Sequence, residues 1–272
     1  MENITELVRN RRSVRTFDGR EISAEEKDKL CAYINNIGNP YEMPIEFKLL
    51  DAKSQGLSSP VVSGTNLYVA AKAKRVPHME EAFGYSFELL VLYALSLGIG
   101  TVWIGGTMDR GSFERAMSLG EDEVMPCVSP LGYPAKKMSI KEGMMRKAIK
   151  ADSRFPFESL FFDSTFDKPL TKETAGKLAM PLEMVRWAPS AVNKQPWRVV
   201  VDKNAAHFYL KRNKGFISDA VGDMQKIDLG IALCHFNLAA EETGLRAIMD
   251  INDPGIVTES DMEYIASYKL TQ

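Results

Sequence analysis

The chain repeats itself once, with a period of about 150 residues. Residues 17–25, FDGREISAE, reappear as FDKPLTKE at residues 166–173, an offset of 149 (166 − 17). An apolar stretch that ends at Gly98 has a counterpart that ends at Gly244, an offset of 146 (244 − 98). A repeat of this length has the size of a domain. The sequence therefore predicts a duplicated domain, with a first copy at residues 1–163 and a second, shortened copy at residues 164–272.

The most distinctive stretch is a loop bounded by two prolines, Pro189 and Pro196, between a helical pattern and the apolar run VVV. Each proline disfavours helical geometry in the residue before it, so we expect a fixed helix-to-strand connection. Ser190, Asn193 and Gln195 give this loop a hydroxyl and two amides that could hydrogen-bond a planar heterocycle. On spacing alone, an ordinary connection whose polar residues only cap turns explains the pattern equally well.

A basic segment follows the first helical pattern, which covers residues 1–10. In an extended chain Arg11, Ser13 and Arg15 fall on one face, because side chains alternate with a period of two. Two guanidinium groups and a hydroxyl on one face suit an anion such as a ribityl phosphate. Taken alone, so short a basic cluster is more typical of a solvated surface.

Several local patterns predict the remaining elements of the first copy. Ser23 and Glu26 form a capping-box pattern that opens a helix, and Gly38 is expected to end it. A buried helix is expected from residue 83 to 97, because that stretch is apolar on nearly all sides. Strands are expected at residues 45–52, 66–72, 101–106 and 125–133, and the third of them ends in Gly105-Gly106, whose backbone N–H groups could approach a ligand closely.

Three segments resemble the signatures of one family. The stretches APSAVNKQPW (188–197), RRSVR (11–15) and LGIGTVWIGG (97–106) are similar to the APSxxNxQPW, RxSxR and GLGTxWIGG segments of the FMN-dependent nitroreductase-like superfamily. The resemblance implies an α+β fold with a mixed, mainly antiparallel sheet flanked by helices. It also implies a flavin at the interface of two protomers, one supplying the basic motif and the other the proline-bounded loop.

In this chain the first copy has the basic motif but not the proline-bounded loop, and the second copy has the loop but not the basic motif. Opposite the basic motif, residues 160–165 of the second copy carry no positive charge. Opposite Pro189, Ser190, Asn193 and Gln195, the first copy has Ile37, Gly38, Tyr41 and Met43, so the polar contacts of the loop are gone. We therefore expect a single-chain pseudodimer with one flavin site. Phe161, Phe162 and Met43 are expected to fill the degenerate second site.

The resemblance also implies the residues that contact FMN. Arg11, Ser13 and Arg154 would hold the phosphate, Arg15 would lie near N1 and O2 of the ring, and the backbone N–H groups of Gly105 and Gly106 would lie near N5. The remaining expected contacts are Ile104, Pro189, Ser190, Asn193 and Gln195. The expectation for Arg154 rests on the similarity of residues 154–158 to an RxPxEE segment of the family. Family members usually have a further Lys or Arg two residues earlier. This chain has Asp152 at that position, so Arg146 or Lys150 could take the place of the missing basic residue.

The function implied is an FMN-dependent oxidoreductase of nitroreductase type. NADH or NADPH would donate electrons, and a nitroaromatic or a quinone would accept them. No catalytic side chain is named, because the flavin performs the redox chemistry. Two alternatives stay open: a flavin-binding or flavin-sensing protein without turnover, and a flavoenzyme of the same fold with different chemistry.

Composition indicates which classes of binding partner to expect. With 34 Lys and Arg against 36 Asp and Glu, the net charge of -2 gives no electrostatic reason to expect nucleic acid or a membrane. No apolar window reaches membrane-spanning length, and we expect a cytoplasmic monomer that acts on small molecules. Cys31, Cys127 and Cys234 are widely separated and are expected to be buried, reduced thiols, and neither they nor the three histidines have metal-ligand spacing.

Overall fold

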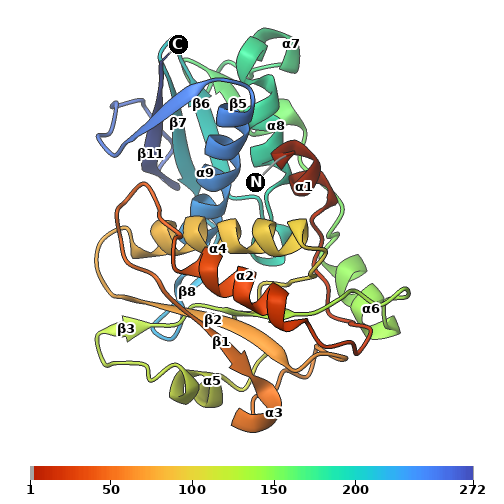
Figure 1. Cartoon of the computed structure of the whole chain (residues 1–272). Helices are drawn as coiled ribbons and strands as arrows, with labels where there is room; N and C mark the ends of the chain where they lie inside the picture. Colours follow the sequence, from red (N-terminus) through yellow and green to blue (C-terminus); the bar gives the residue numbers. More distant parts are fainter. Residues whose placement is uncertain (1–2, 272) are drawn as a thin grey trace.

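The computed structural model describes residues 3–271 and contains two sheets separated by two long helices (Figure 1). The helices are α1 (Ile4–Asn10), α2 (Ala24–Ile34), α3 (Ala52–Gln55), α4 (Met79–Ser96), α5 (Arg110–Ala116), α6 (Ile140–Ala148), α7 (Lys172–Ala175), α8 (Ala179–Trp187) and α9 (Met224–Glu242). Three single turns of 3₁₀ helix join them: η1 (Phe157–Ser159), η2 (Gly176–Leu178) and η3 (Ala191–Asn193). This is a mixed α+β architecture, as the sequence predicted.

The first sheet is built around β2 (Leu67–Lys74), which pairs antiparallel with β1 (Glu46–Asp51), β3 (Glu123–Val124) and β4 (Val128–Leu131). Six consecutive residues of β2 are buried, which explains why this strand is apolar on both faces. The strands expected at 45–52 and 66–72 are therefore confirmed within two residues.

The second sheet has the order β10-β11-β7-β6-β5. Its strands are β5 (Phe161–Asp163), β6 (Trp197–Val201), β7 (Ala205–Lys211), β10 (Arg246–Asp250) and β11 (Met262–Thr271), and a small hairpin is formed by β8 (Ile217–Ser218) and β9 (Gly222–Asp223). All neighbours are antiparallel except β5, which runs parallel to β6. The strand that ends the first predicted copy thus completes the sheet of the second.

Helices α4 and α9 cross between the two sheets and make the most extensive helix contact of the fold. A Cβ atom on Gly84 of α4 would lie 2.1 Å from the carbonyl oxygen of Ile227, and one on Gly230 of α9 would lie 2.1 Å from that of Glu81. The helices can approach so closely only because both positions lack a side chain. The two contacts are reciprocal, since 230 − 84 and 227 − 81 both equal 146. A twofold axis through the crossing would relate them in this way.

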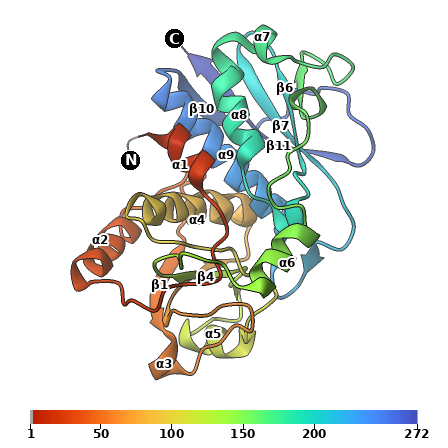
Figure 2. The same ribbon diagram turned by 90° about the vertical axis from the view of Figure 1, so that its right-hand side faces the viewer.

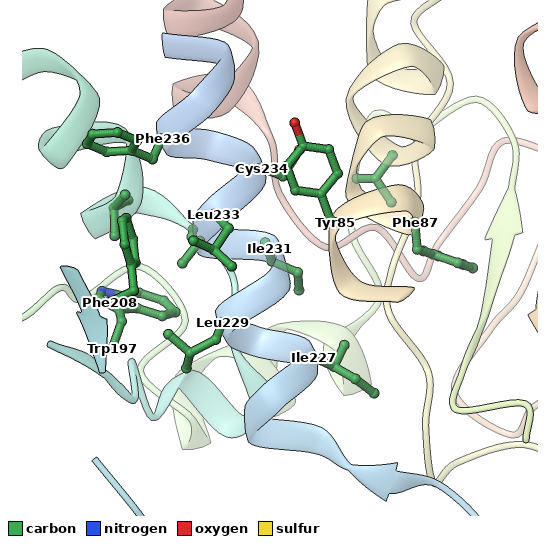
Figure 3. Close-up of a cluster of buried hydrophobic side chains, with 14 of the residues drawn as sticks. Tyr85, Phe87, Trp197, Phe208, Ile227, Leu229, Ile231, Leu233, Cys234 and Phe236 are labelled. Carbon is green, nitrogen blue, oxygen red and sulfur yellow. The ribbon is translucent and has the colours of Figure 1, made fainter. Parts of the chain in front are cut away.

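The main core lies on both sides of α9 (Figure 3). Leu229 and Leu233 point from α9 toward Trp197 and Phe208 of the second sheet, whereas Ile227 lies on the side of α4. All five are 5% exposed or less. Burying side chains of this size stabilises the fold by about 1.5–3 kcal/mol each relative to exposure. Helix α9 therefore joins the two halves into one core.

The first helix is fixed by a residue far away in sequence. The Asn3 side chain makes no cap; instead the Glu242 carboxylate at the end of α9 accepts hydrogen bonds from the N–H groups of Ile4 and Thr5, at 2.5 and 3.0 Å. A carboxylate at a helix N-terminus satisfies free N–H groups and complements the helix dipole. This contact places the basic segment after α1 beside the centre of the molecule.

Of three other local predictions, two are confirmed and one is wrong. The capping box of Ser23 and Glu26 is confirmed, and so is the buried helix, which begins four residues earlier than expected at Met79. The helix end at Gly38 is wrong, because α2 stops at Ile34, where Asn36 bonds back to the carbonyl of Ala32.

Two further expectations fail. Residues 101–106 form only isolated bridges instead of a strand, since the N–H of Val102 donates to the Ser129 hydroxyl in place of a backbone carbonyl. The burial expected for Cys31 is also wrong: it lies on the solvent face of α2. Within residues 3–271, no helix combines the length and the apolar character needed to cross a membrane.

Candidate functional site

A cavity of about 440 Å³ lies between the two halves, and we call it the central cavity. Its first wall comes from the N-terminal half, its second from the loop after α8 and the start of α9, and α6 covers one side; Figure 2 shows α6 beside this junction. The volume falls within the range of about 300–1,000 Å³ typical of small-molecule sites. The lining includes Ser13, Arg15, Trp103, Gly105, Gly106, Cys127, Met145, Ala148, Ile149, Pro189, Ser190, Ala191, Val192, Ile227, Asp228 and Ile231.

The first wall is a pair of extended segments. The N–H of Val14 donates to the carbonyl of Thr101 at 2.9 Å, which brings Ser13 and Arg15 beside the segment that ends in Gly105 and Gly106. Neither glycine N–H donates to any acceptor in the described part of the chain. The wall therefore presents free backbone donors next to a guanidinium group.

Arg110 holds this glycine segment in place. Its guanidinium group donates to the carbonyl oxygens of Gly105 at 2.6 Å, Met125 at 2.7 Å and Ala220 at 3.2 Å. Two of these acceptors belong to the first half and one to the second. A planar fork that satisfies several carbonyls fixes their relative positions, so Arg110 braces the mouth of the central cavity.

Four arginines gather at one end of the cavity: Arg11, Arg15, Arg146 and Arg154, here called the arginine cluster. The Arg15 side chain makes no hydrogen bond to the described residues, and its Nε and Nη1 atoms are buried without a partner. The Nε atoms of Arg11 and Arg154 are buried and unpartnered as well. Buried N–H groups normally have acceptors. Three guanidinium groups with unused donors therefore point to an anion that belongs between them.

The electrostatics of the cluster agree with this interpretation. Burial lowers the pKa of Arg11 and of Arg15. Glu88 opposes this effect at Arg11 and Glu142 opposes it at Arg15, whereas the charge of Arg146 adds to it at both. Burial, together with the charges of Arg11 and Arg186, lowers the pKa of Arg154 to about 10. The arginines thus repel one another, and Glu88, Glu142 and Asp152 are the carboxylates that oppose this repulsion. A bound dianion would relieve that repulsion.

One counter-charge near the cluster is shared with a histidine. Glu88 of α4 and His235 of α9 are fully buried and lie 2.9 Å apart. The second Glu88 oxygen accepts a hydrogen bond from Trp103 Nε1 at 3.0 Å, and Arg11 Nε lies 3.8 Å from the first. Since His235 Nδ1 donates to the carbonyl of Met184, Nε2 faces Glu88. This pairing links the crossing of α4 and α9 to the wall of the cavity.

The loop after α8 is held in an unusual conformation. Val192, Asn193 and Gln195 all have positive φ, at 43°, 58° and 49°. For a β-branched residue such as Val192 this is a strained backbone, which persists only where the surroundings fix it. Ser190 Oγ accepts the N–H of Gln195 at 2.8 Å, and both oxygens of Asp228 lie within 3.1 Å of the N–H of Ala191.

The two amides of this loop do not face the cavity. Asn193 Nδ2 donates to the carbonyls of Lys150 and Ser153, and Gln195 Oε1 accepts the N–H of Phe155 at 2.8 Å. These bonds fasten the segment that carries Arg154 to the second half. In the structure the amides therefore position an arginine, and neither Asn193 nor Gln195 is among the residues that line the central cavity.

Six of the residues expected from sequence line the central cavity: Ser13, Arg15, Gly105, Gly106, Pro189 and Ser190. Arg11 and Arg154 lie behind that surface within the arginine cluster, and Arg154 donates to three carbonyl groups, at Ala151, Ser153 and Trp187. Ile104 points into a separate core cluster of the first half and does not reach the cavity.

Three functional features were missed from sequence. Arg110 and the Glu88–His235 pair carry no local signal, because their partners come from distant segments. Asp228 had one: it is a carboxyl within a stretch that is otherwise apolar. Lys150 is exposed, and its backbone carbonyl accepts the hydrogen bond from Asn193. Among residues 3–271 there is no cluster of three or more His, Cys, Asp or Glu side chains that could hold a metal ion.

Comparisons with known proteins identify a family and a similar solved structure. The family model described as "Putative TM nitroreductase" matches residues 3–240, most of the chain. The crystal structure of a "putative nitroreductase" from Thermotoga maritima MSB8 superimposes with a TM-score of 0.63 and 23% identity, covering 98% of this chain and 93% of that one. The two proteins therefore share a fold. No curated protein sequence matches the chain.

Two further solved structures cover about half of this chain. A "Putative NADH dehydrogenase/NAD(P)H nitroreductase" from Bacteroides thetaiotaomicron VPI-5482 is 19% identical over 51% of this chain and 90% of that one, with a TM-score of 0.44. An "FMN-dependent Nitroreductase" from Clostridium difficile R20291 is 16% identical over 52% and 94%, with a TM-score of 0.41.

Proposed function

Because the chain belongs to the family described as "Putative TM nitroreductase", we propose that it is an FMN-dependent oxidoreductase that passes electrons from NADH or NADPH to a small electron-poor acceptor. Nitroaromatics and quinones are the acceptor classes that we propose. The observation that carries the proposal is the arginine cluster at the end of an otherwise apolar cavity, where buried donor atoms of Arg11, Arg15 and Arg154 have no acceptor among the described residues. The cluster suits a phosphate, and the cavity suits a flat ring system.

The residues of this chain fit FMN in two ways. Arg11, Arg15 and Arg154 have unused donors for the phosphate and the polar edge of the ring. The free N–H groups of Gly105 and Gly106 can hydrogen-bond a ring nitrogen or oxygen where negative charge develops on reduction. When bound, the flavin supplies hydride and electron transfer.

The second half contributes orientation and exclusion of water. Pro189 and Ser190 close the wall opposite the arginines, in a loop that Asp228 and Gln195 hold rigid. Met145 and Ile149 of α6 and Ile227 of α9 give the cavity an apolar lining. An apolar, rigid surround strengthens electrostatic contacts with a bound ring and orients it for transfer.

We also propose that residues 1–163 and 164–272 are two copies of one domain and that the chain is a monomer with one flavin site. The reciprocal contacts of Gly84 and Gly230, with the same offset of 146 as the sequence repeat, support the duplication. At the pseudo-equivalent position, Phe161 is fully buried in the core and leaves no basic side chain for a phosphate.

The test is flavin loading. The purified full chain is incubated with excess FMN, desalted and measured by visible absorption, and oxidation of NADH and NADPH is then followed with menadione as the acceptor. We expect about one FMN per chain and flavin-dependent turnover. Two flavins per chain would contradict the single site, and a protein that retains no flavin would contradict the proposed function.

A further inference from the structure

One buried carboxyl group at the cavity, which holds the loop after α8, has no direct contact with the flavin in the scheme above. Asp228 lies one turn into α9, is only 4% exposed and lines the central cavity between Ile227 and the loop residue Ala191. Both of its oxygens, at 3.0 and 3.1 Å, share the single N–H of Ala191. No cation pairs with it among residues 3–271. A carboxyl group in such surroundings favours its neutral form.

A neutral Asp228 has a proton with no acceptor. The N–H of Ala191 is a donor, so it satisfies the carboxyl oxygens but cannot receive the O–H hydrogen. No other hydrogen bond of the Asp228 side chain occurs in the described part of the chain. A buried O–H group without a protein partner, in a cavity wall, calls for an acceptor atom on a bound molecule.

Helix packing does not require an acid at this position. Under the offset of 146 that relates the two helices, the counterpart of Asp228 is Ala82 of α4 (228 − 146), which is fully buried at the same crossing. The carboxyl group is therefore present only on the helix that borders the central cavity. If the crossing of the helices required a carboxyl group, we would expect one at the equivalent position of both helices.

We propose that Asp228 donates a proton to the electron acceptor bound in the central cavity, an inference that rests on the proposed function. Reduction of a quinone to a hydroquinone takes two electrons and two protons. Hydride from the nicotinamide donor accounts for both electrons and one proton. Asp228 supplies the other: its O–H bond breaks as an O–H bond forms on a quinone oxygen. The carboxylate left behind takes a proton from water after product release.

The surroundings agree with this role. Burial raises the pKa of Asp228 well above its ordinary value; the hydrogen bond from the N–H of Ala191 opposes this effect, and the negative charge of Asp223 adds to it. Asp223 is itself paired with Arg212. Across the cavity, Arg15 is the charged group and Cys127 the other titratable one, and burial raises the pKa of that thiol. The Cys127 thiol therefore stays neutral and does not compete as a base.

The decisive variant is Asp228→Asn, which keeps the size of the side chain and an oxygen for the N–H of Ala191 but has no acidic proton. Two acceptors are compared in the FMN-loaded protein: menadione, which needs protons, and ferricyanide, which takes only electrons. We expect the variant to lose on the order of 100-fold in menadione turnover, the size of a general-acid contribution, and to keep ferricyanide turnover within about twofold. An equal effect on both acceptors would overturn the proposal.

A second readout does not depend on activity. The infrared difference spectrum of the unmodified protein minus D228N at pH 8 should contain the band of a protonated carboxyl group. Its absence would overturn the proposal. The matched control is Glu81→Gln, another buried carboxyl group on the partner helix that does not line the cavity, and it should leave the ratio of the two turnovers unchanged.

Two other outcomes can be distinguished from a failure of the proposal alone: a D228N variant that does not fold, and a protein that reduces neither acceptor. If D228N does not fold, the solvent isotope effect of the unmodified protein decides: menadione reduction should slow in D₂O by more than ferricyanide reduction, and equal effects would overturn the proposal. If neither acceptor is reduced by the unmodified, FMN-loaded protein, the proposed function itself fails, and the role of Asp228 fails with it.

Discussion

Gly84 and Gly230, 146 residues apart (230 − 84), lie at one crossing of α4 and α9, and each makes room for a carbonyl group of the other helix. The relationship joins the two halves of the chain at a single point. Because the limiting atoms are backbone atoms, neither helix can yield to an added methyl group without a shift of the whole helix.

We expect Gly84→Ala to destabilise the protein by about 3 kcal/mol or more, since overpacking against backbone costs at least as much as overpacking among side chains. Urea unfolding at constant pH measures the change. The control is Gly111→Ala in α5, where the added Cβ would meet only the flexible end of Arg115 at 3.5 Å. An unchanged midpoint for G84A would show that the helices separate more easily than this contact implies.

Arg15→Met should have opposite effects on the flavin-free and the flavin-bound protein. The variant removes a buried, unpartnered guanidinium group, so we expect the flavin-free protein to gain about 1 kcal/mol of stability. FMN binding should weaken by roughly 10- to 100-fold, the value of a charge-assisted hydrogen bond. Thermal unfolding with and without FMN measures both effects.

Arg115→Met, at an exposed arginine of α5, serves as the control for Arg15 and should change neither quantity. A loss of stability in flavin-free R15M would mean that Arg15 already has a partner in the protein. The proposed anion site would then lose its main support.

The pH dependence of stability should contain a contribution from Glu81. Its burial in α4 raises its pKa from an ordinary value near 4.5 to about 7. The folded state therefore binds a proton more tightly than the unfolded state, and stability falls as the pH rises from about 4.5 through about 7. The shift corresponds to about 3 kcal/mol.

Glu81→Gln should remove this dependence. Compared with the unmodified protein, the variant should gain about 3 kcal/mol between pH 4 and pH 8 in urea unfolding experiments, because only the unmodified protein pays for ionising a buried group. Parallel stability curves for the two proteins over that range would contradict the prediction.

Asn193→Gly should loosen the segment that carries Arg154. Glycine accepts the positive φ of this position but cannot donate to the carbonyls of Lys150 and Ser153. We expect a loss of about 1–2 kcal/mol of local stability, faster hydrogen exchange in residues 146–155 and weaker FMN retention. Asn252→Gly, on an exposed loop away from the cavity, is the control; equal exchange in both variants would refute the positioning role.

The sequence indicated the family, the α+β class and most elements, because periodicity, caps and short motifs are local. The capping box of Ser23 and Glu26 could be identified from four residues. The sequence also indicated that Ser13, Arg15 and Ser190 line one site, although they come from distant segments. This was possible because the resemblance to family motifs carries information about tertiary structure.

The side-chain roles could not be read in the same way. Asn193 and Gln195 have the residue types of ligand contacts, but their acceptors and donors are backbone groups of residues 150–155, which no pattern in the loop reveals. Residues 101–106 have a strand-like composition, yet a side chain, that of Ser129, interrupts the ladder. Contacts of this kind depend on packing that forms only in the folded chain.

Both walls of the central cavity belong to one polypeptide. Where two separate protomers build a site, dilution below their dissociation constant dismantles it. Here β5 and the crossing of α4 and α9 keep the walls together at an effective concentration that does not depend on how many molecules are present. The affinity for the proposed flavin should therefore not depend on the concentration of the protein.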